Sequence, residues 1–191
     1  MRIGRTRLPI PANEYEQAWG NQLIRAIDQN FDAAFSSIEN SPAITGYYGS
    51  FYSDQTQTAA APNTPYAMTV NNTVASNQIA VLNNSQITFK NRGVYNIQFS
   101  AQIDQSSGSP HYIWIWFRKN GTDIPDSTSK VSLQGSKAEL IPAWNFIVNV
   151  LGGDYVEIMW AVEDTAVELL YESATAFCPA IPSVIITAVS V

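Results

Sequence analysis

The sequence holds few of the residues on which catalytic and metal sites depend. Its 191 residues include a single cysteine, Cys178, and a single histidine, His111. One cysteine excludes an internal disulfide and a thiolate metal site, and we interpret Cys178 as a small, buried, apolar side chain. A hydrolase triad or a zinc site needs several partners around a histidine. We therefore predict a structural role for His111, no enzyme activity and no cofactor.

Charged residues are also scarce. They make up 14% of the chain, and the formal net charge is −6, whereas about a quarter of the residues of an average globular domain are charged. The negative balance argues against binding to nucleic acid. No apolar run is long enough to cross a membrane, and no apolar segment follows the N-terminal arginines as it would in a signal peptide. We expect no nucleic-acid or membrane partner, and synthesis in a cytosol.

Residues 93–103 have the clearest pattern in the chain. Apolar residues occupy every second position of this segment: Tyr95, Ile97, Phe99, Ala101 and Ile103. The intervening positions are polar but uncharged: Asn96, Gln98, Ser100 and Gln102. Successive side chains of a strand point to opposite faces, so the first set fills a core and the second set points away from it. A face without Lys or Glu suggests cover by another subunit, and its four polar residues are candidates for the interface of a homotrimer.

A helix is predicted in residues 13–41. Asn13 is a good N-cap, and the helix ends before Pro42, which disfavours helical geometry in the preceding residue. Apolar residues recur within it at alternating spacings of three and four: Ile24, Ile27, Phe31, Ala34 and Ile38. This is the seam of a short coiled coil, and isoleucine at both seam positions favours trimers. All of the seam residues except Ala34 are candidates for a trimer interface. The alternative is that the helix packs on its own domain.

Residues 1–12 are predicted to form an extended docking arm. Three of the chain's ten basic residues lie here: Arg2, Arg5 and Arg7. The segment Leu8-Pro9-Ile10-Pro11 follows, and alternating prolines favour a polyproline-like conformation without internal hydrogen bonds. The arginines, Leu8 and Ile10 would place this arm on an acidic or polar partner surface. The alternative is a frayed, solvated terminus.

The rest of the chain, residues 42–191, is predicted to be an all-β jelly-roll sandwich of about 8–10 antiparallel strands. Short β-type runs recur between turn signals, and no segment after residue 66 has helical periodicity. A first strand is expected after Tyr47, and the others lie near 66–70, 78–82, 86–90, 93–103, 111–119, 141–151, 154–163, 165–171 and 182–191. Asn120-Gly121 and Gly152-Gly153 are typical turn dipeptides.

Three segments of this domain carry more specific expectations. Residues 112–117 are apolar on both faces, so their strand should be buried by the core on one side and by another layer on the other. Residues 183–191 are also largely two-sided, which predicts a central strand. Residues 123–138 are polar and are predicted to be a loop with at most a short strand. The tryptophans on predicted strands are expected in the core or in an interface: Trp114, Trp116, Trp144 and Trp160.

The order of motifs in residues 46–191 resembles the tumour-necrosis-factor-like jelly roll of complement globular heads. That family carries Gly-x-Tyr on a central strand, matched by Gly93 and Tyr95, and a hydrophobic strand that ends in Asn-Gly, matched by Asn120-Gly121. Its Leu-x-x-Gly-Asp-x-Val motif is close to residues 150–156. The aromatic-Ser-Gly signature of the family's last strand is absent, as is its usual cysteine before the central strand. The resemblance implies a jelly roll of this type.

Residues 8–31 are similar to the N-terminal part of marine-bacteriophage virion proteins. The similarity lies in Leu8-Pro9-Ile10-Pro11, Asn13-Glu14-Tyr15 and residues 22–31. Such proteins join an Arg- and Pro-containing terminus and a helix to a jelly roll rich in Asn, Gln, Trp and Tyr. The similarity implies a virion protein made in the cytoplasm of a host bacterium, with other capsid or tail proteins as its partners.

Two hypotheses of function follow. The first is a trimeric, non-enzymatic virion protein that residues 1–40 attach to the particle, as a capsid decoration, cement or small-fibre protein. The second is a fibre knob that binds a receptor or a host-surface glycan through exposed Trp and Tyr. A fibre knob normally caps a long repeat-bearing shaft, and the sequence contains none, which favours the first hypothesis.

Overall fold

The computed structural model describes residues 17–39, 46–135 and 137–191. The chain divides into two compact units, residues 1–46 and 47–191. In the first unit, helix α1 spans Gln17–Glu39, in agreement with the three-and-four spacing of its apolar residues. The predicted cap, Asn13, and the predicted arm lie outside the described residues. In the described part of the chain, no helix has the length and apolar character that crossing a membrane requires.

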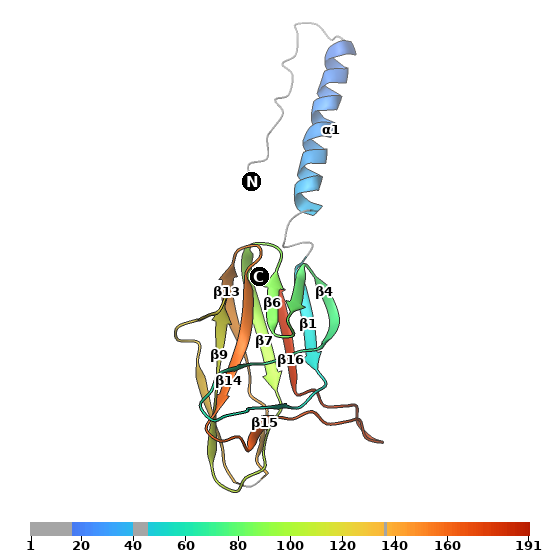
Figure 1. Ribbon diagram of the computed structural model, residues 1–191. Coiled ribbons are helices and arrows are strands. Elements are labelled where there is room, and N and C mark those ends of the chain that lie inside the picture. Colours follow the sequence, from blue (N-terminus) through green and yellow to red (C-terminus); the bar gives the residue numbers. More distant parts are fainter. Residues whose placement is uncertain (1–16, 40–45, 136) are drawn as a thin grey trace. The chain divides into compact units, whose positions relative to one another are not determined.

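The second unit begins with a five-stranded antiparallel sheet, which we call the first sheet (Figure 1). Its strand order is β13 (Ala143–Val150), β7 (Gly93–Ala101), β16 (Val184–Ser190), β1 (Tyr48–Ser53) and β4 (Asn72–Asn77). The last strand of the chain, β16, lies between β7 and β1. Its central position agrees with the prediction from its two-sided apolar pattern.

A seven-stranded antiparallel sheet, the second sheet, packs against the first. Its main order is β10 (Thr122–Asp123), β9 (His111–Lys119), β14 (Tyr155–Val162), β6 (Gln86–Phe89) and β5 (Ile79–Leu82). Two more strands complete it: β11 (Ser129–Leu133) pairs with β9, and β3 (Tyr66–Ala67) pairs with β14. The predicted loop at residues 123–138 therefore contains a short strand, β11.

A small third sheet closes one end of the sandwich. Its order is β12 (Glu139–Leu140), β8 (Ile103–Gln105), β15 (Val167–Leu169) and β2 (Gln57–Thr58). The single strand predicted over residues 93–103 is therefore wrong, because β7 ends at Ala101 and Ile103 belongs to β8. Pro142 stands opposite Ala101 and has no N–H with which to extend the ladder. Gln102 instead donates its N–H to Ser183 O (2.9 Å) and accepts from Leu170 N (2.7 Å).

Aromatic side chains from the two large sheets meet in the core. Phe117 of β9 stacks on Phe146 of β13 at 4.7 Å between ring centroids, and Phe99 of β7 approaches Phe117 edge-on at 6.2 Å. Each fully buried apolar side chain contributes about 1.5–3 kcal/mol to folding. Two antiparallel sheets around such a layer form the predicted all-β jelly-roll sandwich. The described residues contain sixteen strands, more than predicted, because the sequence pattern misses β2, β4, β10 and β12 and does not separate β8 from β7.

Both predicted turn dipeptides lie between consecutive strands, but only Asn120-Gly121 closes a hairpin, because Gly152-Gly153 joins strands of two different sheets. Asn120 and Gly121 join β9 to β10 with φ of 48° and 80°, the left-handed conformation that a two-residue hairpin turn requires. Gly152 and Gly153 join β13 to β14, and a Cβ on Gly152 would lie 2.8 Å from the Lys90 carbonyl oxygen. Only glycine fits at this point without a backbone shift.

The outer side of β9 departs from the prediction of two buried faces. Ile113, Ile115 and Phe117 are fully buried in the core. Tyr112, Trp114 and Trp116, which point the other way, are only half-buried, so among the described residues no further layer covers this side of β9. The two-sided apolar pattern here reflects a surface with aromatic side chains.

Two carboxylates stand side by side in the third sheet and provide a test of its electrostatics. Glu168 pairs in register with Asp104, and burial together with the Asp104 charge raises the pKa of Glu168 above its ordinary value of 4.5. The folded protein then holds the Glu168 proton more tightly than the unfolded chain does. The free energy of unfolding therefore falls as the pH rises from about 4.5 through the folded pKa. We expect Glu168→Gln to raise the melting temperature by a few degrees at pH 7 and to have little effect at pH 4. Thermal melts of both proteins across this range check it, and a variant that melts lower than the parent at pH 7 would contradict it.

Candidate functional site

The outer face of the first sheet carries no charged side chain. None of its five strands contains Asp, Glu, Lys, Arg or His. The strands of the second sheet, in contrast, include Arg118, Lys130 and Glu157. A sheet face that only meets water normally carries charged residues, so their absence from five neighbouring strands distinguishes this surface from the rest of the domain.

Strand register arranges the outward side chains of this sheet in rows that run from β13 through β7 and β16 to β1. The central row is polar: Asn145, Gln98, Thr187 and Ser50. The row on one side of it is mostly apolar: Ile147, Asn96, Val189 and Tyr48. The row on the other side is mixed: Ala143, Ser100, Ile185 and Tyr52. We call these three rows together the uncharged face.

Large apolar side chains of the uncharged face are open to solvent. Ile147 is 59% exposed, Tyr48 44% and Ile185 41%. Contiguous exposed apolar surface on a soluble protein marks an interaction site more often than a free surface. The uncharged face therefore offers apolar side chains that a partner can bury and polar side chains that can fix the orientation of that partner through hydrogen bonds.

Amide groups of the uncharged face are partly paired within the sheet. Asn145 Nδ2 donates to Asn96 Oδ1 at 3.1 Å across β13 and β7. Gln98 lies at the centre of the face, is exposed, and has no side-chain hydrogen bond to any described residue. Its amide can both donate and accept, so it is free to bond to a partner.

Three of the four polar residues predicted for the trimer interface lie together on this surface. Asn96, Gln98 and Ser100 occupy successive outward positions of β7. Gln102 does not join them in the sheet, because it lies between β7 and β8. The outward residues of β13, β16 and β1 were not predicted as part of the site. The signal that could have found them is the complete lack of charge in their segments.

The helical candidates form an exposed seam on α1. Ile24, Ile27 and Phe31 are 59%, 38% and 61% exposed, which leaves an apolar stripe available to another helix. Ile38 belongs to the end of α1, but its side chain lies outside the described residues, as do the docking candidates of the arm: Arg2, Arg5, Arg7, Leu8 and Ile10.

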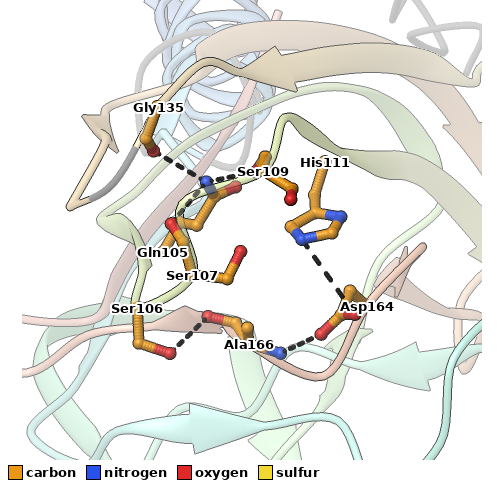
Figure 2. A network of polar contacts seen from close by, with 8 residues as sticks. All are labelled: Gln105, Ser106, Ser107, Ser109, His111, Gly135, Asp164 and Ala166. Carbon is orange, nitrogen blue, oxygen red and sulfur yellow. Dashed lines mark hydrogen bonds and ion pairs between the residues drawn. The ribbon is translucent and has the colours of Figure 1, made fainter.

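The only histidine lies in a polar cluster at the end of the domain where the third sheet lies (Figure 2). His111 Nε2 is 4.0 Å from Asp164 Oδ2, and Asp164 Oδ1 accepts a hydrogen bond from Ala166 N at 2.8 Å. In the described part of the chain, no hydroxyl group is hydrogen-bonded to the imidazole, so this pair is not joined to a nucleophile. Nor do the described His, Cys, Asp and Glu side chains include any group of three placed to hold a metal ion.

A buried glutamine holds this polar cluster together. Gln105 is fully buried. The two hydrogens of its Nε2 group are shared among three carbonyl oxygens, those of Ser109 (2.7 Å), Gly135 (2.8 Å) and Ser107 (3.1 Å) (Figure 2). A single side chain therefore supplies donors to backbone carbonyls of two separate loops, which satisfies groups that would otherwise be costly to bury. We assign this cluster a structural role.

Comparison with known proteins gives likenesses in structure but none in sequence family. No family model matches the sequence, and no curated protein matches it. Among solved structures, the chain is similar to the globular domain of zebrafish complement 1qA protein, with 17% identity, a TM-score of 0.46, and coverage of 76% of this chain and 96% of that chain. At this identity and TM-score the likeness carries no functional conclusion, and the assignment of a jelly roll comes from the strand order described above. The similarity of residues 8–31 to bacteriophage virion proteins stays a prediction.

Proposed function

We propose that the chain is a non-enzymatic structural subunit that associates as a homotrimer through its uncharged face. The observation that carries this proposal is the absence of charge from all five strands of the first sheet, together with the exposure of Ile147, Tyr48 and Ile185. Burying these apolar side chains contributes roughly 25 cal/mol for each Å² removed from water.

A symmetric interface accounts for the polar residues as well. Around a three-fold axis every side chain occurs three times, so one charge would bring three like charges together. Uncharged amides such as Gln98 can instead bond to their symmetry mates directly or through trapped water, each bond contributing about 0.5–1.5 kcal/mol. Isoleucines in the exposed seam of α1, Ile24 and Ile27, favour three helices over two.

A second proposal concerns the particle to which the proposed trimer belongs. We assign residues 1–40 to attachment and the trimer to the virion of a marine bacteriophage, where it would act as a capsid decoration, cement or small-fibre protein. Other capsid or tail proteins would then be its partners, and the chain would be made in the host cytoplasm. The similarity of residues 8–31 to virion proteins and the basic, proline-containing arm support this assignment.

Removal of the arm tests the attachment. A chain lacking residues 1–12 is expected to stay folded and trimeric, because the sheets and α1 are intact, but to be lost from particles that retain the full chain. The measurement is the occupancy of both proteins on purified particles, with light scattering of the truncated protein as the control for assembly. Occupancy equal to that of the full chain would show that residues 1–12 have no part in attachment.

A further inference from the structure

The outer face of the second sheet holds a pocket bordered by two tryptophans. Trp114 and Trp116 project from the same side of β9, two residues apart, and line a pocket of about 480 Å³ that is open to solvent. Its other lining residues include Asn63, Asp126 and Ala161. Pockets of about 300–1,000 Å³ with a mostly apolar lining and a few polar groups are typical ligand sites.

One wall of the pocket is fixed by a carboxylate. Asp123 Oδ1 accepts hydrogen bonds from Trp116 Nε1 at 2.8 Å and from Arg118 Nε at 2.7 Å. These bonds, that of Arg118 first, lower the pKa of Asp123, so the carboxylate stays ionised at neutral pH. The indole edge of Trp116 is thereby held in one orientation. The loop that follows Asp123 is also anchored, because the buried Ser127 hydroxyl donates to Ile124 O at 2.8 Å and accepts from Phe117 N at 3.1 Å.

The opposite wall and the floor come from other parts of the chain. Asn63 donates its backbone N–H to Val162 O at 2.7 Å, which fixes the loop containing Asn63 and Pro65 against β14. Ala161 pairs in register with Trp114, and its small side chain leaves space beside the indole. The pocket therefore exists in a single chain and is ordered before any ligand binds, which reduces the entropy lost on binding.

We propose that this pocket binds a neutral hexopyranose unit of a glycan. A pyranose ring presents a flat patch of C–H groups and a rim of hydroxyl groups. Indole faces offer matching flat apolar area, and the side chains of Asn63, Asp126 and Thr128 line the pocket without a hydrogen bond to any other described residue. The charge of Asp123 is balanced by Arg118, whereas no ion pair joins Asp126 to another described residue. The Asp126 carboxylate can accept hydroxyl hydrogens but repels carboxylate or sulfate groups, which selects a neutral sugar over an anionic one. The site goes beyond the proposed trimer and does not depend on it.

Affinity electrophoresis of the full chain tests the pocket. The gels contain dextran, mannan or galactan as neutral probes and alginate as the anionic comparison. We expect retardation by at least one neutral polysaccharide and none by alginate. Trp116→Ala should weaken that binding by about tenfold or more, as loss of an aromatic anchor does. Ala161→Leu, which fills the pocket and deletes no contact, should weaken it to a similar extent in a protein whose thermal melt stays cooperative.

Phe177→Ala is the matched control, because Phe177 is an aromatic side chain 90% exposed on a different loop. It should bind as the parent chain does. No retardation in any neutral gel would overturn the proposal, and so would retardation by alginate alone. Unchanged binding in the Ala161→Leu variant would place any sugar binding elsewhere on the molecule.

Discussion

Replacing Gln98 with glutamate is expected to dissociate the proposed trimer while each jelly roll stays folded. Gln98 is exposed at the centre of the uncharged face, between Asn145 of β13 and Thr187 of β16. The change is nearly isosteric, so it leaves the fold of the subunit intact, but three-fold symmetry brings three carboxylates together away from bulk water. Like charges placed together in an interface cost several kcal/mol, which corresponds to a dissociation constant raised by roughly a hundredfold or more.

Gln134→Glu is the control for this prediction, because it makes the same chemical change at an exposed loop position. Light scattering at a range of protein concentrations should show a trimer for the parent and the control and a monomer for Gln98→Glu. Acidification to about pH 4, near the ordinary pKa of glutamate, should restore part of the association. Equal tolerance of both changes would mean that the uncharged face only meets solvent.

Gln105→Glu is expected to have the largest effect on the stability of the subunit. The two Nε2 hydrogens of Gln105 are shared among three backbone carbonyl oxygens, and a carboxylate at the same place would face these oxygens without a hydrogen to donate. An unpaired charge in a buried site costs about 3–5 kcal/mol, which should lower the melting temperature by roughly 10–20 °C. Burial raises the folded pKa of the introduced carboxyl, so the loss of stability is full above that pKa and shrinks as the pH falls through it.

Thermal melts at pH 7 and pH 4 measure this effect. Gln134→Glu again serves as the control and should melt close to the parent protein at both values. Gln105→Leu, which removes the donors without adding a charge, should be less destabilised at pH 7 and insensitive to the change of pH. A Gln105→Glu protein that melts with the parent at pH 7 would show that the carbonyl groups do not depend on this side chain.

Local patterns in the sequence predict the elements of the fold well. The alternation of Tyr95, Ile97 and Phe99 with polar residues places β7 correctly, because a strand's two faces are encoded at every second residue. Asn120-Gly121 marks its turn because both residues must adopt positive φ, which few other residues do. The spacing of Ile24, Ile27 and Phe31 predicts α1, because residues three and four apart lie on the same face of a helix.

The candidate site is harder to predict, because it depends on which strands become neighbours. Ile147, Thr187 and Tyr48 lie far apart in the chain and share the uncharged face only through the order β13, β7, β16, β1. The Trp114–Trp116 pocket likewise depends on the distant loop containing Asn63. The two tryptophans are half-buried and lie outside the core between the sheets, and their place in an interface stays a prediction. Long-range pairing of this kind has no signal in a local pattern.

Cys178 shows that the usual burial of a residue type does not predict the burial of one side chain. Cysteine is usually buried, yet Cys178 is half-exposed and lies 3.1 Å from Thr175 Oγ1 in the loop between β15 and β16. This loop projects from the body of the domain (Figure 1). Its position follows from the connection between two sheets, and the prediction of a buried side chain was wrong.

The molar mass of the full chain in solution tests self-association most directly. Sedimentation equilibrium or light scattering at micromolar concentration should give three times the chain mass of 21.0 kDa, and the Gln98→Glu variant should shift it toward a single chain. A parent protein with the mass of one chain at all concentrations would contradict a trimer built on the uncharged face.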